Sequence, residues 1–269
     1  VTMQTFRNDK GDEESESSSS AISYAIGVAM TFLLYMFLLL YGQMVMTSII
    51  EEKNNRVLEI VVSSVKPQQL MMGKIVGIGL VAVTQIMIWV VLMAVISGIA
   101  LPALVPADMM SQASAFNAGT IDASALDADP DLLQTISIFS NVGYLLSIFG
   151  YLLLFLIGGF LFYSSIYAAI GSAVDNIQDA GQLQSVVVFP IIIGLISAMT
   201  AAADPNSTMA LVLSLIPFTS PMVMMVRIPF GIPAWEIVTS LILLYISFVI
   251  MVWIAAKIYR VGIFMYGKK

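Results

Sequence analysis

The side chains best suited to recognition or chemistry gather in a charged stretch that directly follows the first long apolar run. Glu51, Glu52 and Lys53 open this stretch, and the residues after them read as a short amphipathic helix. Glu52 and Arg56 are four residues apart, and Arg56 and Glu59 are three apart, so each pair would share one face of that helix. The spacing predicts a short, ionically paired helix outside the membrane.

The opposite face of this predicted helix is apolar. It consists of Leu58, Val61, Val62 and Val65. Ser63 and Ser64, just before Val65, loosen the helix, and Pro67 is well placed to open the next helix, since proline is favoured at the first helical position. Such a segment can dock on a partner protein, or it can be a simple anchor whose basic residues hold a loop on the cytoplasmic side.

The long apolar runs carry neutral polar groups instead of charges. The candidates for lining a transport pathway are Gln43, Thr84, Gln85 and Asn141. Hydrogen bonding between neighbouring helices is the other role open to them. Ion-coupled carriers normally place ionisable side chains at membrane depth, and the cores of these runs have none. A protein that moves a substrate without such groups must draw its energy from outside the bundle.

Several classes of chemistry are excluded by composition. The chain has no cysteine and no histidine, so thiolate catalysis, Cys/His metal sites and imidazole acid–base chemistry are absent. It also lacks the phosphate-binding G-x-x-x-x-G-K-[ST] loop, the G-x-S-x-G motif and the H-E-x-x-H motif. We therefore expect a chain that is not an enzyme, holds no metal or cofactor of its own, and binds no nucleic acid.

The elements that position these residues follow from hydropathy. Of 269 residues, 59% are hydrophobic and 10% charged, and the mean hydropathy is +0.95. Runs of about 20 apolar residues cross a bilayer as helices, because lipid leaves backbone groups no other partners. The sequence predicts an all-α polytopic membrane protein with spans at residues 21–50, 75–101, 136–173, 186–203 and 237–256.

An apolar segment at 211–233 differs from these runs because prolines interrupt it at 217, 221, 229 and 233. Each interior proline removes a helical hydrogen bond and clashes with the preceding turn. A short re-entrant or interfacial hairpin fits this pattern, and a sixth, kinked span is the alternative.

Basic residues predict the orientation. The 51–74 loop and the C-terminus carry eight lysines and arginines: Lys53, Arg56, Lys66, Lys74, Lys257, Arg260, Lys268 and Lys269. The other side has Arg7, Lys10 and Arg227. The positive-inside rule then predicts a multi-pass plasma (inner) membrane protein with the loop and the C-terminus in the cytoplasm. The 102–135 loop, with no basic residue, suits the outer face, and alternation alone puts 174–184 inside.

Residues 1–20 are acidic and serine-rich without apolar periodicity, which predicts a flexible extracytoplasmic lead-in to a transmembrane domain at 21–269. The chain begins at Val1, and an odd number of spans would leave its N-terminus outside. We expect that a further span and an external region precede the sequence.

Three stretches in order resemble the ABC-2 type transporter permeases, the membrane subunits of ATP-binding-cassette exporters. They are EEKNNRVLEIVVSSVKPQQLMMGKIVG at 51–77, YAAIGSAVDNIQDAGQLQ at 167–184 and IPFTSPMVMMVRIPFG at 216–231. The first is the most specific. Within the family, the sequence is most similar to the sodium-efflux-type subgroup.

The resemblance implies a six-helix transmembrane domain, of which five spans are present, and an external re-entrant hairpin before the last span. It implies that the segment from Glu51 to Gln69 couples to an ABC ATPase subunit, which binds ATP and Mg²⁺. It also implies a second permease copy or paralogue, with membrane lipid around the assembly. Export of a substrate is then the expected function, and a membrane scaffold that transports nothing is the alternative.

Overall fold

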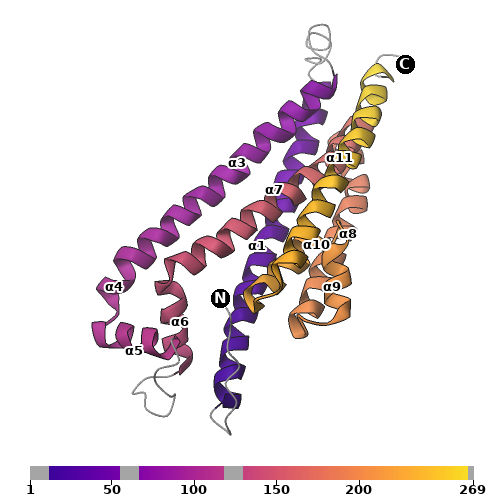
Figure 1. Ribbon diagram of the computed structural model, residues 1–269. Coiled ribbons are helices and arrows are strands. Elements are labelled where there is room, and N and C mark those ends of the chain that lie inside the picture. Colours follow the sequence, from indigo (N-terminus) through magenta and orange to yellow (C-terminus); the bar gives the residue numbers. More distant parts are fainter. Residues whose placement is uncertain (1–11, 55–66, 118–129, 266–269) are drawn as a thin grey trace. The chain divides into compact units, whose positions relative to one another are not determined.

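The computed structural model describes residues 12–54, 67–117 and 130–265, and every regular element within them is helical (Figure 1). Five of the described helices are long and apolar enough to cross a membrane. They are Ile22–Asn54, Gln68–Leu104, Val142–Ala173, Ile177–Ala203 and Ala234–Val261. The prediction of an all-α protein with five spans is thereby confirmed.

The chain divides into two compact units, which are described separately. The first contains residues 1–26 and 87–150, and the second contains 27–86 and 151–269. Three long helices run from one unit into the other: α1 (Asp12–Asn54), α3 (Pro67–Val95) and α7 (Val142–Ala173).

The start of α1 corrects the prediction of an unstructured lead-in, because the helix already begins at Asp12. A helix formed by the apolar run can extend into the residues before it, because each added residue gains one backbone hydrogen bond. Residues 1–11 of the predicted lead-in lie outside the described part of the chain.

In the first unit, α3 passes into a π-helical turn, η1 (Ile96–Ala100), and then α4 (Leu101–Leu104). The helical path therefore continues through Pro102, where the sequence predicted an end. Proline clashes with the carbonyl group four residues earlier, and a widened turn relieves such a clash. The N–H of Leu101 bonds to the carbonyl of Ile96, five residues back, which is the π-helical pattern.

Two short helices follow in the region predicted as a loop, α5 (Ala107–Asn117) and α6 (Pro130–Ser140). A small core of Ala113, Leu133 and Ile136 joins them. The predicted span at 136–173 breaks at Asn141, whose side-chain oxygen accepts a hydrogen bond from the Tyr144 N–H at 3.0 Å. Asn141 thus ends α6 and caps α7.

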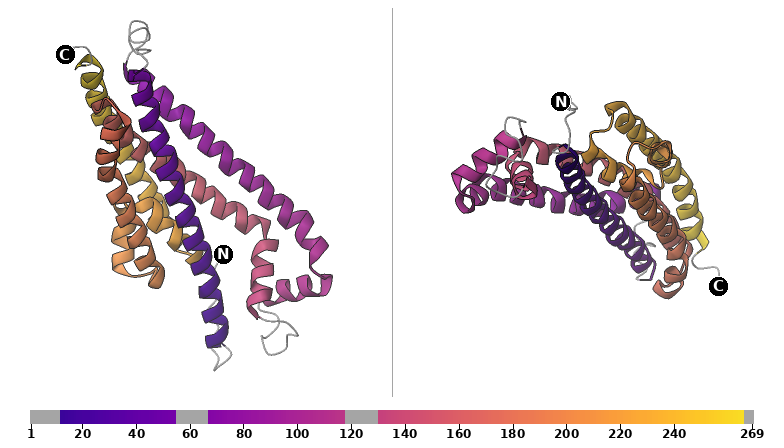
Figure 2. Two further views of the ribbon diagram at one scale, coloured as in Figure 1. Left: turned by 180° about the vertical axis from the view of Figure 1, so that it is seen from behind. Right: turned by 90° about the horizontal axis from the view of Figure 1, so that it is seen from below.

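The second unit contains the rest of α1, α3 and α7, together with α8 (Ile177–Ala203) and α11 (Ala234–Met265). Between the last two lie α9 (Thr208–Leu215), α10 (Ser220–Arg227) and the 3₁₀ turn η3 (Ile228–Phe230). Eight-residue helices rise only about 12 Å, so neither α9 nor α10 crosses a bilayer. Figures 1 and 2 show α8, α9 and α10 side by side, so α9 and α10 form a short helical hairpin packed on α8. Its re-entrant position in the membrane stays a prediction.

Candidate functional site

Lys53, the second-to-last residue of α1, is buried with 2% of its surface exposed. Its Nζ donates hydrogen bonds to the carbonyl oxygens of Ser172 at 2.8 Å and Val174 at 2.7 Å. It also lies 3.3 Å from a carboxylate oxygen of Asp175. These acceptors stand at the C-terminal end of α7, where helix carbonyls lack intrahelical partners and the helix dipole favours a cation.

A second lysine, Lys74, links the start of α3 to α1 through a hydrogen bond and an ion pair. Lys74 Nζ donates to the Ser48 carbonyl at 2.6 Å and lies 2.8 Å from a carboxylate oxygen of Glu52. Lys74 and Lys53 therefore hold the helices on both sides of the 51–74 segment, each with different partners. We call this part of the second unit the loop end: Lys53, Lys74 and the turn at 174–176.

The structure describes part of the predicted coupling segment. Glu51 is exposed on the last turn of α1, and Pro67 is the first residue of α3, as predicted. The remaining predicted residues lie outside the described part of the chain: Arg56, Leu58, Glu59 and Val62. Their amphipathic helix stays a prediction.

The loop end brings two chain-distant turns together. Because Lys53 bonds to residues 172–175, the turn between α7 and α8 lies at the same end of the second unit as the 51–74 segment. From sequence, only the alternation of spans suggested this. The charge of the turn, with Asp175 and Asp179, gave no indication.

The candidate pathway residues each have a local environment of their own. Gln43 on α1 accepts a long hydrogen bond, 3.5 Å, from Gln184 on α8. The Thr84 hydroxyl donates to the Leu80 carbonyl of its own helix at 2.7 Å, Gln85 is exposed, and Asn141 caps α7. For Gln43, joining helices is the observed role, and Thr84 and Asn141 have local structural roles.

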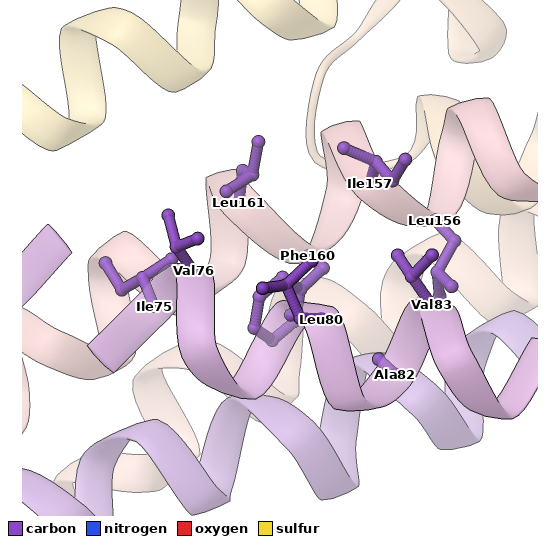
Figure 3. Close-up of a pocket in the computed structure, with 10 residues that line it drawn as sticks. Ile75, Val76, Leu80, Ala82, Val83, Leu156, Ile157, Phe160 and Leu161 are labelled. Atoms are coloured by element: carbon purple, nitrogen blue, oxygen red, sulfur yellow. The ribbon is translucent and has the colours of Figure 1, made fainter. Parts of the chain in front are cut away.

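A pocket of about 220 Å³ lies between α3 and α7 in the second unit, and all ten lining residues are apolar (Figure 3). Gly79 and Phe160 set its width, because a Cβ atom at Gly79 would lie 2.8 Å from the Phe160 ring. Water needs polar partners to occupy a cavity. The pocket therefore suits hydrocarbon. Among the described residues, no cluster of three acidic side chains could hold a metal ion.

The opposite end of the second unit is closed by residues 204–233, which we call the hairpin end. The tip of the hairpin, from Phe218 to Met222, packs against three spans. Thr31 Oγ1 of α1 donates a hydrogen bond to the Met222 carbonyl at 3.0 Å. Tyr163 Oη of α7 donates to the Phe218 carbonyl at 2.5 Å. A Cβ at Gly194 of α8 would lie 2.8 Å from Met222 Sδ. Gly194 is about nine residues, or about 13 Å, from the end of α8, so the tip reaches well along the bundle.

Arg227 anchors this hairpin and is 2% exposed. Its guanidinium donates to the Pro205 carbonyl at 2.7 Å and to the Ser214 hydroxyl at 2.9 Å, and lies 2.7 Å from a carboxylate oxygen of Glu236. Glu236, in the first turn of α11, is also buried. One arginine thus ties the α8–α9 turn, α9 and α11 together.

Sequence reasoning missed Arg227, Glu236, Lys74 and Asp175 as site residues. A detectable signal existed for the first pair, because an arginine in an otherwise apolar, proline-rich segment needs a nearby carboxylate. Glu236 is the next acidic residue in the chain. The partners of Lys53 carry no such signal, since they are backbone carbonyls about 120 positions away.

In comparison with known families, residues 1–257 match the model of the ABC-2 family transporter proteins. Two curated relatives extend over most of the chain. The uncharacterized protein YhaP of Bacillus subtilis is 28% identical over 261 residues, covering 96% of this chain and 56% of that protein. The uncharacterized protein MJ1024 of Methanocaldococcus jannaschii is 30% identical over 246 residues, covering 91% of this chain and 51% of that protein.

The chain therefore spans about half the length of the curated relatives it matches. No solved structure gives a significant match. The family match does not extend to a subgroup, so the similarity to sodium-efflux-type permeases stays a prediction.

Proposed function

The chain belongs to the ABC-2 family of transporter proteins, and from this premise we propose that it is the permease subunit of an exporter driven by a separate ATP-binding-cassette ATPase. Its five apolar helices suit a multi-pass membrane protein. The family is a membrane component and not itself an ATPase. In this proposal ATP and Mg²⁺ bind to the ATPase subunit.

The observation that carries the proposal is the loop end. Lys53 holds the end of α1 to the turn between α7 and α8, and Lys74 holds α3 to α1. A push on the 51–74 segment would therefore reach several helices at once. Packed helices respond to such a push by shifting as rigid bodies between discrete arrangements.

The absence of charge from the span cores supports an external energy source. Buried ions in the described part of the second unit lie near helix ends: Lys53 at the loop end, and Arg227 and Glu236 at the hairpin end. Ion-coupled carriers need ionisable groups near the bilayer midplane. ATP hydrolysis by a partner supplies the energy in our proposal.

The orientation we propose puts the loop end and the C-terminus in the cytoplasm, where the ATPase is, and the hairpin end on the outer side of the inner membrane. The eight basic residues of the 51–74 loop and the C-terminus support it. Export then means release past residues 204–233. A second permease copy or paralogue completes the transport unit in this proposal.

The test is the double substitution Arg56→Ala with Glu59→Ala, in the chain purified together with its ATPase. We expect ATP hydrolysis stimulated by the permease to fall about 5-fold or more, because coupling between sites typically spans that range. Arg260→Ala is the matched control, since Arg260 is an exposed charge near the C-terminus of α11. Unchanged hydrolysis and assembly in the double variant would contradict the proposed docking segment.

The alternative, a scaffold that transports nothing, shares the same hydropathy. It predicts that the chain purifies from its own membranes without an ATPase partner. Copurification of an ATPase whose hydrolysis the chain stimulates would exclude it.

A further inference from the structure

The turn that receives Lys53 is short and fixed at both sides. α7 ends at Ala173 and α8 begins at Ile177, so three residues join them. Asn176 caps α8: its side-chain oxygen accepts from the Asp179 N–H at 2.7 Å, and its amide nitrogen donates to the Asp179 carboxylate at 2.8 Å. A displacement of Val174 and Asp175 must therefore carry the start of α8 with it.

At the loop end, Lys53 of α1 binds the end of α7 and the short turn that leads into α8. At the other end of the second unit, Met222 of the hairpin accepts a hydrogen bond from Thr31 of α1, and its sulfur packs on Gly194 of α8. α1 and α8 are thus linked at the loop end through Lys53 and the turn, and at the hairpin end through Met222. Such a closed frame shifts as one body only while both joints hold.

The contacts of Lys53 with the turn are strong and confined to three neighbouring residues. Its ammonium bonds to two backbone carbonyls and one carboxylate, and hydrogen bonds to an ionised group are stronger than neutral ones. Removing a lysine from such a place leaves buried carbonyls without donors. Arginine in the same position keeps the charge, but its planar guanidinium cannot make the same hydrogen bonds as the compact ammonium.

Building on the proposed function, we propose that Lys53 is a positioning residue that makes the α7–α8 turn follow the coupling segment. When the ATPase moves residues 51–69, Lys53 transmits the movement to the turn at 174–176 and through it to α8, so that α1 and α8 shift together. Without the Lys53 side chain, the coupling segment moves but the turn does not move with it.

The test uses spin labels, because a chain without cysteine accepts a chosen pair with no background. Met44→Cys on α1 and Gly181→Cys on α8 are exposed, and nothing lies within 4 Å of a Cβ at Gly181. The distance between the labels is measured in the complex with its ATPase, without nucleotide and trapped with ATP and vanadate. In the otherwise unmodified chain we expect the same distance in both states.

Lys53→Met is the decisive variant. We expect its label distance to differ between the two states and its stimulated ATP hydrolysis to fall about 5-fold or more. Lys53→Arg should retain part of the hydrolysis. Lys74→Met is the matched control, because Lys74 is a lysine of the same end that bonds to α1 and not to the turn; its label distance should stay constant.

The proposal is overturned if Lys53→Met keeps one label distance and full stimulated hydrolysis, or if Lys74→Met reproduces its behaviour. Should Lys53→Met fail to accumulate in the membrane, Lys53→Gln takes its place. The glutamine amide can donate to a carbonyl but carries no charge, so we expect a smaller difference between the label distances of the two states. Identical distances in the two states would overturn the proposal. An unmodified chain that stimulates no ATPase would instead contradict the proposed function.

Discussion

The loop end and the hairpin end of the second unit each bury a cation, but they neutralise it differently. Lys53 faces backbone carbonyls and Asp175, whose side chain is 67% exposed. Arg227 faces Glu236, whose side chain is 8% exposed. The loop end thus keeps one partner, Asp175, in contact with water and can exchange it, whereas the hairpin end holds a buried ion pair.

This difference matches the roles we propose. At the loop end, the two buried carbonyl bonds keep the turn attached to Lys53 while the helices shift, and the exposed Asp175 carboxylate adds little because water screens it. A hairpin that caps a pathway must keep its shape while helices shift around it. A buried ion pair with additional hydrogen bonds meets that need, because breaking it strands a charge.

The largest effect is expected at the hairpin end. Glu236→Gln leaves the Arg227 charge buried without its carboxylate, and loss of one member of a buried pair costs about 3 to 5 kcal/mol of unfolding free energy. Unfolding in detergent micelles measures it. Replacing both residues, Arg227→Met with Glu236→Leu, should recover much of the loss. If Glu236→Gln unfolds like the parent, the Arg227–Glu236 pair does not stabilise the hairpin end, and the proposed difference between the two ends is contradicted.

A smaller effect is expected from filling the helix contact at the loop end. A Cβ at Gly171 of α7 would lie 2.8 Å from the Met46 carbonyl oxygen of α1, a backbone atom that cannot move aside alone. Gly171→Leu should therefore lower the unfolding free energy by about 1 to 3 kcal/mol, the usual range for overpacking. Gly181→Leu is the control, with open space around it. Equal stability of the two variants would show that α1 and α7 are not closely packed there.

The smallest effect is expected between the ends, at Thr84. Its hydroxyl bonds to the Leu80 carbonyl of its own helix, so Thr84→Val should change unfolding free energy by no more than about 0.5 kcal/mol. Stimulated ATP hydrolysis should also stay at the parent level. A clear fall in hydrolysis with unchanged stability would return Thr84 to the pathway and extend the functional region beyond the two ends.

Much of this architecture could be predicted from sequence, for reasons that differ between elements. Span number follows from apolar length, since a bilayer enforces helices of about 20 residues. The hairpin followed from proline spacing: Pro217 lies between α9 and α10, and Pro229 falls in η3. Apolar length and proline spacing are properties of a continuous stretch of chain, so they can be recognised in the sequence.

The remaining features depend on long-range contacts or on weak local signals. The partners of Lys53 lie about 120 positions away and are backbone atoms, which have no residue identity to read. α5 and α6 were predicted as loop, because their short apolar faces meet only when both helices form. The π-helical turn before Pro102 could not be predicted, because a proline ordinarily ends a helix.

We propose above all that the loop end faces the cytoplasm, where an ATPase can bind it. Gln68→Cys reports on the loop end and Asn206→Cys on the hairpin end, since both positions are exposed and the parent has no cysteine. The measurement is labelling by a membrane-impermeant maleimide in intact and permeabilised cells. We predict that Asn206→Cys is labelled in intact cells and Gln68→Cys only after permeabilisation. Labelling of Gln68→Cys in intact cells would contradict the account.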